Sequence, residues 1–314
     1  MTTARPLRSA RRQRGAALLT AMIIVTLVAT LAAAMVWQQW RAVQVESAER
    51  ARTQAAWMAT AALDIARLYL REDQKSGLPT ALTEPWAIPL EEARLSTLLA
   101  VDKSNADDGP EAFLSGNITD LQARYNLTNL VVASKIVPAE LQTLERLCQT
   151  LGVDGSVAAR IAGGLRDAAA ATGAVPLQPT TVSQLAWLGI DASSIASLRP
   201  YVAILPVVTP VNLNTASKEV LAAAIEGLDT ERLIQIRQRP PFRSPQDLVQ
   251  RLSMPALPPT ANVGVHSDFF EVRVRLRIAD RVLTERSVVQ RQANPPRIVV
   301  LQRERIAGLE QLGS

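Results

Sequence analysis

Few side chains in this sequence of 314 residues have the type and spacing that enzymatic chemistry requires. The single histidine, His266, leaves no second imidazole for a catalytic or transition-metal site, and it is expected in a loop before a strand. The single cysteine, Cys148, lies in an apolar helical stretch, where a small buried side chain is its usual role. The neighbouring carboxylates of Asp107–Asp108 and Glu91–Glu92 point in different directions and are expected at the surface. We therefore predict no enzyme, no catalytic residue and no cofactor site.

The chain instead offers a site for chemistry done to it, the peptide bond between Gly15 and Ala16. The fifteen residues that end at Gly15 carry five arginines and no acid, and an apolar segment follows. The junction Arg14-Gly15-Ala16-Ala17-Leu18-Leu19 looks like a prepilin peptidase site, where a basic leader ends in glycine and the apolar helix becomes the mature N-terminus. Two other fates compete with this cleavage: an uncleaved anchor, and a secretory signal removed after Ala32-Ala33-Ala34.

The segment from Ala16 to Val36 has the length and composition of a membrane span. Its 21 residues carry no charge, and a helix of this length covers about 30 Å, the thickness of a bilayer core. The arginines before it predict an N-terminus on the cytoplasmic side, and Trp37 and Trp40 suit the opposite interface. We therefore expect a single pass, with everything after Trp40 outside the cytoplasm.

The apolar pattern continues beyond the membrane as one helical stripe. Seven apolar residues recur at spacings of three and four, which places them on one face of a helix. No glycine or proline interrupts the chain from Ala16 to about Gln74, so one continuous helix is expected, half in lipid and half outside. The stripe, which is expected to pack against neighbouring helices or a sheet, consists of Ala48, Ala51, Ala55, Met58, Ala62, Ile65 and Tyr69.

An alternating pattern predicts an antiparallel sheet in the rest of the chain. From Phe270 to Ile278, apolar residues occupy the even positions, whereas Glu271 and three arginines occupy the odd positions. This is the pattern of a half-buried strand with a solvated polar face. The other elements expected outside the helical part are short strands at 118–130, 282–290 and 297–302, turns at 107–110 and 279–281, and a short helix at 90–100.

Start and stop signals mark a helical block at about 138–252. Prolines suit the first helical positions, polar residues suit the caps, and glycines suit the ends. Two asparagine-rich phrases, Asn126–Leu130 and Asn212–Ala216, precede pairs of helices. Helix starts are expected at Pro138, at Asp154 or Ser156, and at Asp191, Thr215, Thr230 and Ser244; stops are expected at Gly152, Gly189, Pro200, Gly227 and Pro240.

Taken with the leader and the long helix, these phrases make the chain resemble the minor pseudopilin K family of the type II (general) secretion pathway. The resemblance covers residues 11 to about 302. Its most specific motifs are the leader junction, the phrase Asn212-Leu213-Asn214-Thr215-Ala216 followed by Val220-Leu221, and the segment from Arg239 to Ser244 followed by Asp247-Leu248. The family functions in the export of folded proteins across the bacterial outer membrane.

The resemblance implies a fold class and a domain order. It implies an α+β fold, in which a long N-terminal transmembrane and amphipathic helix packs on an antiparallel pilin-like β-sheet that carries a large inserted α-helical domain. The expected domains are a basic prepilin leader at 1–15, the transmembrane and periplasmic helix at 16–76, the first part of the β domain at 77–134, the inserted helical domain with helix-hairpin-helix-like units at 135–255, and the completing strands at 256–314.

It also implies a position and a set of partners. The protein is expected in the inner membrane with a periplasmic head, at the tip of the pseudopilus, where it helps to initiate assembly and to control length. The implied partners are the minor pseudopilins I and J, with H as a further one, besides prepilin peptidase, the inner-membrane assembly platform and membrane lipid. Ala16 is expected to be N-methylated after cleavage, and Leu18, Leu19 and Thr20 to serve membrane insertion and assembly.

Two positions bear on the resemblance: the first agrees with it and the second departs from it. Most pilin-like subunits carry a glutamate at the fifth residue of the mature chain, where this chain has Thr20, and K members characteristically lack that glutamate. A carboxylate in lipid needs a partner, which a subunit at the tip does not have above it. Many K members also carry an acidic segment linked to calcium, whereas the segment after Gly163 offers Asp167 and few other carboxylates. We therefore predict no metal site.

Two other functions compete with this prediction. The phrase at Asn212–Ala216 followed by a glycine-turned helix pair also resembles helix-hairpin-helix modules of DNA-uptake proteins, with the turn Glu226–Asp229 facing phosphates. The two acids of that turn oppose phosphate binding, and the leader accounts for the whole formal charge of +5. No nucleic-acid partner is therefore expected. The second competitor is a minor pilin of a type IV pilus, against which the size of the helical insertion argues.

Overall fold

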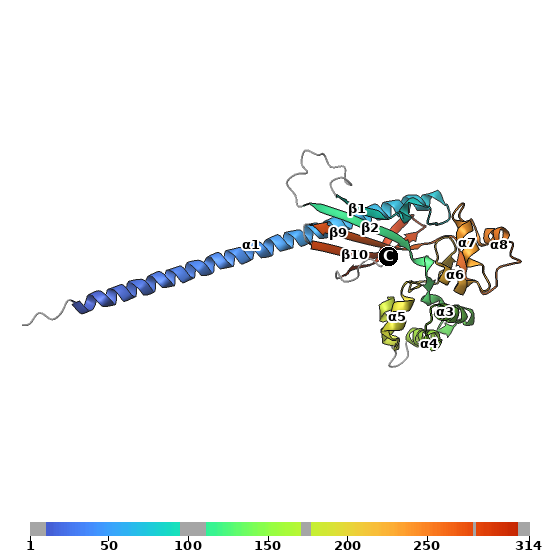
Figure 1. Ribbon diagram of the computed structural model, residues 1–314, viewed down its shortest axis with the longest axis horizontal. Coiled ribbons are helices and arrows are strands. Elements are labelled where there is room, and N and C mark those ends of the chain that lie inside the picture. Colours follow the sequence, from blue (N-terminus) through green and yellow to red (C-terminus); the bar gives the residue numbers. More distant parts are fainter. Residues whose placement is uncertain (1–10, 95–110, 171–176, 279–280, 307–314) are drawn as a thin grey trace, which may run out of the picture. The chain divides into compact units, whose positions relative to one another are not determined.

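The structure is a computed structural model that describes residues 11–94, 111–170, 177–278 and 281–306, with side chains from residue 16 onward. Contacts divide the chain into two compact units, Met1–Trp57 and Met58–Ser314. Helix α1 (Arg11–Ser76) begins in the first unit and ends in the second (Figure 1). It runs for 66 residues without interruption, so it contains the continuous helix predicted from Ala16 to about Gln74 and begins five residues earlier. It ends before Gly77, whose φ of 66° favours glycine.

The second unit is built on one sheet that has five strands among the described residues (Figure 1). Their order is β1-β2-β9-β10-β11, and every neighbouring pair is antiparallel. The strands predicted from Phe269 onward are confirmed, and the last two are longer than predicted. The bounds are β1 (Leu90–Arg94), β2 (Ala112–Asp120), β9 (Phe269–Ile278), β10 (Arg281–Gln292) and β11 (Arg297–Ile306).

Strand β9 has the predicted alternation but a different polar face. Val272, Val274 and Leu276 are buried, and α1 covers this side of the sheet (Figure 1). On the opposite side Glu271 is only 1% exposed, so the prediction of a solvated row is wrong at this position. A buried carboxylate persists only when it is paired, and arginines from β9 and β10 pair with Glu271.

A helical block lies between β2 and β9 in the chain and holds the largest buried apolar cluster of the described residues. Pro138, Asp191 and Ser244 begin or cap helices as predicted. Thr215 does not, because Ser217 is the residue that caps the next helix and accepts from Val220 N. The helices are α3 (Pro138–Thr150), α4 (Ser156–Ala170), α5 (Ala192–Leu198), α6 (Lys218–Ala224), α7 (Thr230–Arg237) and α8 (Pro245–Leu252).

Short elements connect these parts. Residues 118–130, predicted as strands, contain the end of β2, two 3-10 turns and a short strand. The helix predicted at 90–100 is wrong at its start, because Leu90–Arg94 pairs with β2 as an edge strand, and pairing overrides a local preference. The rest of that segment, and the turns at 107–110 and 279–280, lie outside the described residues. The connecting elements are η1 (Pro85–Ala87), η3 (Leu121–Ala123), β3 (Tyr125–Asn126), η4 (Leu127–Leu130), β4 (Val131–Val132), β5 (Lys135–Ile136), η5 (Val182–Leu188), β6 (Val202–Ala203), β7 (Val211–Asn212) and β8 (Val263–Gly264).

Candidate membrane anchor and subunit-docking groove

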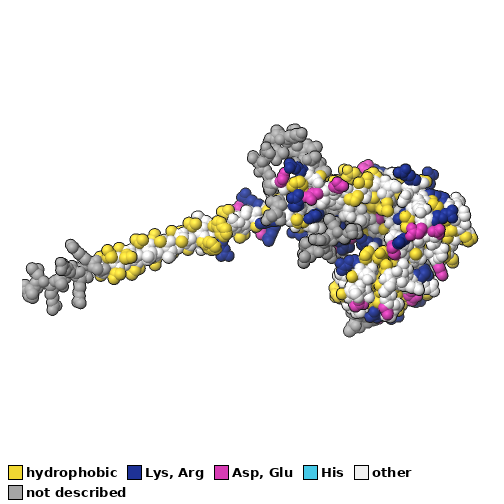
Figure 2. All heavy atoms as spheres, viewed as in Figure 1, with side chains coloured by type: hydrophobic (Ala, Val, Ile, Leu, Met, Phe, Trp, Pro, Cys, Tyr) yellow, Lys and Arg dark blue, Asp and Glu magenta, His cyan; other side chains and the backbone are white. Residues whose placement is uncertain are grey.

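The predicted processing and membrane residues all lie in α1. Gly15 and Ala16 are helical, and the side chains of Leu18, Leu19 and Thr20 are exposed. Among the described residues α1 is the one helix long and apolar enough to cross a membrane; its most apolar window has a mean hydropathy of 2.4 and none of it is buried. Figure 2 shows this part of the helix as a run of apolar side chains.

The hydroxyl groups in the apolar part of α1 find acceptors within their own helix. Thr20 Oγ1 donates to Ala16 O at 3.1 Å or to Ala17 O at 3.0 Å. Thr26 and Thr30 donate to carbonyls three residues earlier, both at 2.9 Å. Because lipid offers no hydrogen-bond partners, such internal bonding lets a polar side chain enter the bilayer. Thr20 therefore needs no partner from another chain, unlike a carboxylate at the same place.

Beyond the first unit, α1 packs on the sheet with only one side of its apolar surface. Ala59, Leu63 and Leu70 are buried against the sheet. Within this single chain, the predicted stripe is buried at Ala62 but not at two later members. Ile65 and Tyr69 stay 38% and 55% exposed, because the sheet covers the neighbouring side of the helix.

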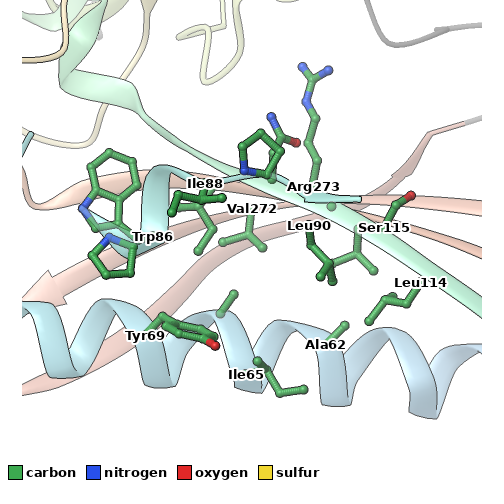
Figure 3. A pocket seen from close by; sticks show the side chains of 17 residues that line it. Ala62, Ile65, Tyr69, Trp86, Ile88, Leu90, Leu114, Ser115, Val272 and Arg273 are labelled. Atoms are coloured by element: carbon green, nitrogen blue, oxygen red, sulfur yellow. The ribbon is translucent and has the colours of Figure 1, made fainter. Parts of the chain in front are cut away.

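These exposed side chains form one wall of an apolar groove (Figure 3). Ile65 and Tyr69 lie on α1 on one side, Ile88 and Leu90 lie on the other, and Val272 lies on the sheet. The cavity has a volume of about 460 Å³. Ile88 is 70% exposed. Exposed apolar surface that is gathered in a concavity is typical of an interaction site.

The far wall of the groove is fixed by Trp86. Its ring meets Phe270 edge to face with a centroid separation of 5.2 Å, and its Nε1 donates to Glu84 Oε2 at 2.6 Å. Burial raises the pKa of Glu84 to about 7; the hydrogen bond from Trp86 opposes this shift and the nearby Asp73 adds to it. The wall is therefore held by a buried aromatic pair beside an acidic cluster.

Polar contacts join α1 to strands β10 and β11, along the flank of the helix that faces away from the groove. Arg67 donates from Nη2 to Ile298 O at 2.9 Å, and Arg303 donates to Thr60 Oγ1 at 2.9 Å. Asp73 forms an ion pair with Arg291, which stacks over the ring of Phe270 at 4.4 Å. These bonds all reach β10 or β11 or the residues beside them. The helix is thus fixed along one edge, and the side toward β1 and β2 remains open.

The two asparagine-rich phrases are used inside the fold. Asn212 donates to Asp120 Oδ2 at 3.0 Å, and Thr215 and Ser267 donate to the same oxygen at 2.6 Å. Burial raises the pKa of Asp120, and the bonds from Ser267, Thr215 and Asn212 oppose this. Asn126 has the same kind of role, since it donates to Val207 O at 2.8 Å. The asparagine side chains of both phrases therefore donate hydrogen bonds to other segments of the same chain, and these amides are not available to a ligand.

The turn that the competing nucleic-acid hypothesis requires has the wrong charge for phosphate. Glu226 is exposed, and Asp229 accepts from Arg232 N at 3.0 Å as the cap of α7.

Cys148 is buried, as predicted. Across the described ranges, no group of three or more His, Cys, Asp and Glu side chains is placed to hold a metal ion.

The sequence signalled the anchor but not the groove. The periodicity of α1 predicts a packed stripe that includes Ile65 and Tyr69, and a short helix is predicted from Leu90, directly after the apolar residues Ile88 and Pro89. The signal that could have revealed the groove was this second exposed apolar cluster, close to the end of an already apolar helix.

Comparisons with known proteins agree with this architecture. Two family models described as type II secretion system protein K match residues 123–207 and 211–266. The chain is similar to type II secretion system protein K of Dickeya chrysanthemi, with 30% identity and coverage of 90% of this chain and 94% of the relative. The protein K of Pseudomonas aeruginosa is 29% identical, with 90% of each chain covered.

A solved structure has the same fold. The match is to the GspK–GspI–GspJ complex of the enterotoxigenic Escherichia coli type 2 secretion system, with a TM-score of 0.65, 22% identity, and coverage of 83% of this chain and 98% of that chain. This similarity confirms the α+β class with a long N-terminal helix, an antiparallel sheet and several further helices. Together with the extent and identity of the sequence matches, it leads to one conclusion: this chain belongs to the type II secretion system protein K family.

Proposed function

We propose that this protein is an assembly subunit without enzymatic activity, which caps the tip of the pseudopilus together with the minor pseudopilins I and J. In this position it helps to initiate assembly and to control length during export of folded proteins. The observation that carries the proposal is α1, which contains an apolar segment of membrane length after Gly15 and continues unbroken to Ser76 in the second unit. The protein K relative that was solved with GspI and GspJ supports the choice of partners, with H as a further candidate.

The proposal includes a topology and a division into domains. The N-terminus lies in the cytoplasm before processing, α1 crosses the inner membrane once with Leu18 and Leu19 in lipid, and the head is periplasmic. The leader is residues 1–15 and the long helix residues 16–76. The β domain is formed by residues 77–134 and 256–314, and the inserted helical domain by residues 135–255. The assembly platform in the inner membrane is the expected contact of the anchor.

Processing by prepilin peptidase is the step that tests this proposal. Cleavage between Gly15 and Ala16 removes all five leader arginines, and methylation of Ala16 removes none of the apolar character of the new end. The experiment is intact-mass spectrometry of the protein purified from its own host. We expect a chain that starts at N-methylated Ala16, and a Gly15→Leu variant that keeps its leader.

Other masses would contradict the proposal in distinct ways. A chain that starts at Met35 would indicate an exported protein cut after Ala34, and an intact Met1 would indicate a simple anchor. A Thr30→Val variant is the matched control, because the hydroxyl that it removes donates only to Leu27 O of the same helix. It should be processed like the natural sequence.

A further inference from the structure

A second cavity lies on the face of the sheet that does not carry α1. It has a volume of about 260 Å³ and lies between β10 and β11 on one side and the loops of the helical block on the other. Arg286 and Val288 line it from β10, and their side chains alternate with the buried Val289. The groove described above is therefore separate from this cavity.

Three guanidinium groups beside this cavity share one buried carboxylate. Glu271 Oε1 accepts from Arg273 at 2.6 Å, and Glu271 Oε2 accepts from Arg286 at 2.7 Å. Arg124 Nη1 is 4.0 Å from Oε2, which is too far for a hydrogen bond. Arg286 is further paired with Glu304 at 2.8 Å. These ion pairs bring three arginines to two glutamates, and the carboxylate of Asp120 also attracts Arg124.

Arg124 has the longest ion pair of these three arginines. Within the described part of the chain its side chain makes the long ion pair with Glu271 and no hydrogen bond. Burial lowers its pKa, the attraction of Glu271 opposes this shift, and the charges of Arg273 and Arg286 add to it. A guanidinium carries five donors in a planar fork that matches a carboxylate. Arg124 lines the cavity and can direct these donors into it.

The lining of the cavity favours a ligand that has an apolar part as well as a negative charge. Leu205, Val288 and Leu301 line the cavity with apolar surface, beside Arg124 and Arg286. An aliphatic stem that ends in a carboxylate matches both parts, and the recess is small enough for about one side chain. A nucleic acid would need a row of cations along its phosphates. We infer that this cavity binds the glutamate side chain of an acidic segment in another protein chain.

The test uses the full-length protein in detergent micelles and a fluorescent, end-blocked tetraglutamate peptide as the probe. Arg124→Gln removes the positive charge and the planar fork of five donors, and should abolish binding. Gln178→Glu, at an exposed position that lines the cavity, keeps the shape of the side chain and places a competing carboxylate there. It should weaken binding about tenfold or more, as expected for losing a bond to a charged group. Gln149→Glu on α3 makes the same charge change away from the cavity and should bind as the natural chain does.

Each alternative result overturns the inference. Absence of peptide binding at about 10 mM would mean that the site takes no carboxylate of this kind, since affinities near 1 mM are the weak end of recognition. Equal binding by the natural chain and Gln178→Glu would place the peptide elsewhere. Tighter binding of an eight-residue thymidine strand than of tetraglutamate would assign the site to a nucleic acid instead.

Discussion

At the scale of residues, the hydrogen bonding of Thr20 bears on how the anchor could enter an assembly. Its hydroxyl is bonded to Ala16 O and Ala17 O, so nothing in its chemistry calls for a neighbouring chain. A carboxylate at this place would have to find a cation in lipid or pay a desolvation cost. Thr20 therefore suits a subunit that has a neighbour on one side only.

We expect Thr20→Glu to impair assembly and Thr20→Val to preserve it. An unpaired carboxylate in the bilayer costs up to about 3 kcal/mol, whereas the valine variant loses only a bond within its own helix. The measurement is the amount of protein recovered from membranes with pseudopilins I and J, with total membrane-bound protein as the control. Full recovery of Thr20→Glu would argue that a cation reaches this position, and hence against a place at the tip.

Glu84 gives the head a predictable dependence on pH. Burial raises its pKa in the folded protein from 4.5 to about 7, beside Asp73, Arg291 and Trp86. A raised folded-state pKa means that this carboxyl stabilises the fold fully below pH 4.5, and that the contribution is lost as the pH rises through about 7. Between these values the head should become less stable as the pH increases.

Glu84→Gln should remove this dependence. The amide keeps an oxygen for Trp86 and carries no charge at any pH, so the variant should melt at a higher temperature than the natural chain at pH 8. The measurement is thermal unfolding at pH 5, 6.5 and 8. Glu91→Gln, an exposed change on β1, is the matched control. A Glu84→Gln variant with the natural pH slope would show that this carboxyl is not the group that titrates.

At the scale of elements, Gly116 permits β2 and β9 to pair closely. A Cβ atom at this position would lie 2.5 Å from Arg273 O, a backbone atom that cannot move aside alone. We expect Gly116→Ala to destabilise the head by about 1–3 kcal/mol, the usual cost of overpacking. The measurement is the urea midpoint followed by tryptophan fluorescence.

Gly155→Ala is the matched control for that change. A Cβ atom at Gly155 meets nothing within 4 Å, so this variant should stay within about 0.5 kcal/mol of the natural chain, as surface substitutions usually do. Equal midpoints for the two variants would mean that β9 can shift to accommodate a methyl group.

The elements differ in how far the sequence could predict them. Strand β9 was predictable because its alternation repeats over nine residues. Helix α3 was predictable because a proline within a helix is tolerated only in the first turn, so Pro138 marks the start. The start of β1 was predicted as a helix because Leu90–Arg94 has no alternation, and its pairing with β2 is a long-range contact that no local pattern contains. The buried state of Glu271 was missed for the same reason, since its partner Arg286 lies on another strand.

The site was predictable only where it is local. The junction at Gly15 and the apolar run after it are properties of adjacent residues, and the sequence was sufficient to propose them. The groove requires Ile88 and Tyr69 to meet across a cavity, and the acceptors of Asn212 include Asp120 and Thr80, far away in the chain. Such contacts depend on the register of the whole sheet.

At the scale of the whole molecule, we propose the apolar groove as the contact surface for a partner pseudopilin. We expect Ile88→Glu to reduce recovery of pseudopilins I and J with the full-length chain about tenfold or more, because a charge in an apolar contact is costly to bury. Ile88 is 70% exposed, so the change should leave folding intact. The measurement is quantitative co-purification from membranes.

Val132→Glu provides the comparison for this experiment. Val132 is 50% exposed on the short strand β4 (Val131–Val132), does not line the groove, and undergoes nearly the same chemical change. It should retain both partners. Undiminished recovery with Ile88→Glu would place the partner interface elsewhere, while leaving the processing test of the proposed function unaffected.

The order of strands in the sheet has a consequence for biogenesis. β2 ends at Asp120 and its neighbour β9 begins at Phe269, so the 148 residues from 121 to 268 must emerge before the two can pair. At about 5–20 residues per second, synthesis of that stretch takes about 7–30 s. During this interval the nascent head presents an unpaired strand edge and an uncovered apolar side of α1. Strands β9, β10 and β11 can complete the sheet only after that stretch has been made, so we expect a chain truncated before Phe269 to be a substrate for chaperones and proteases rather than a smaller subunit.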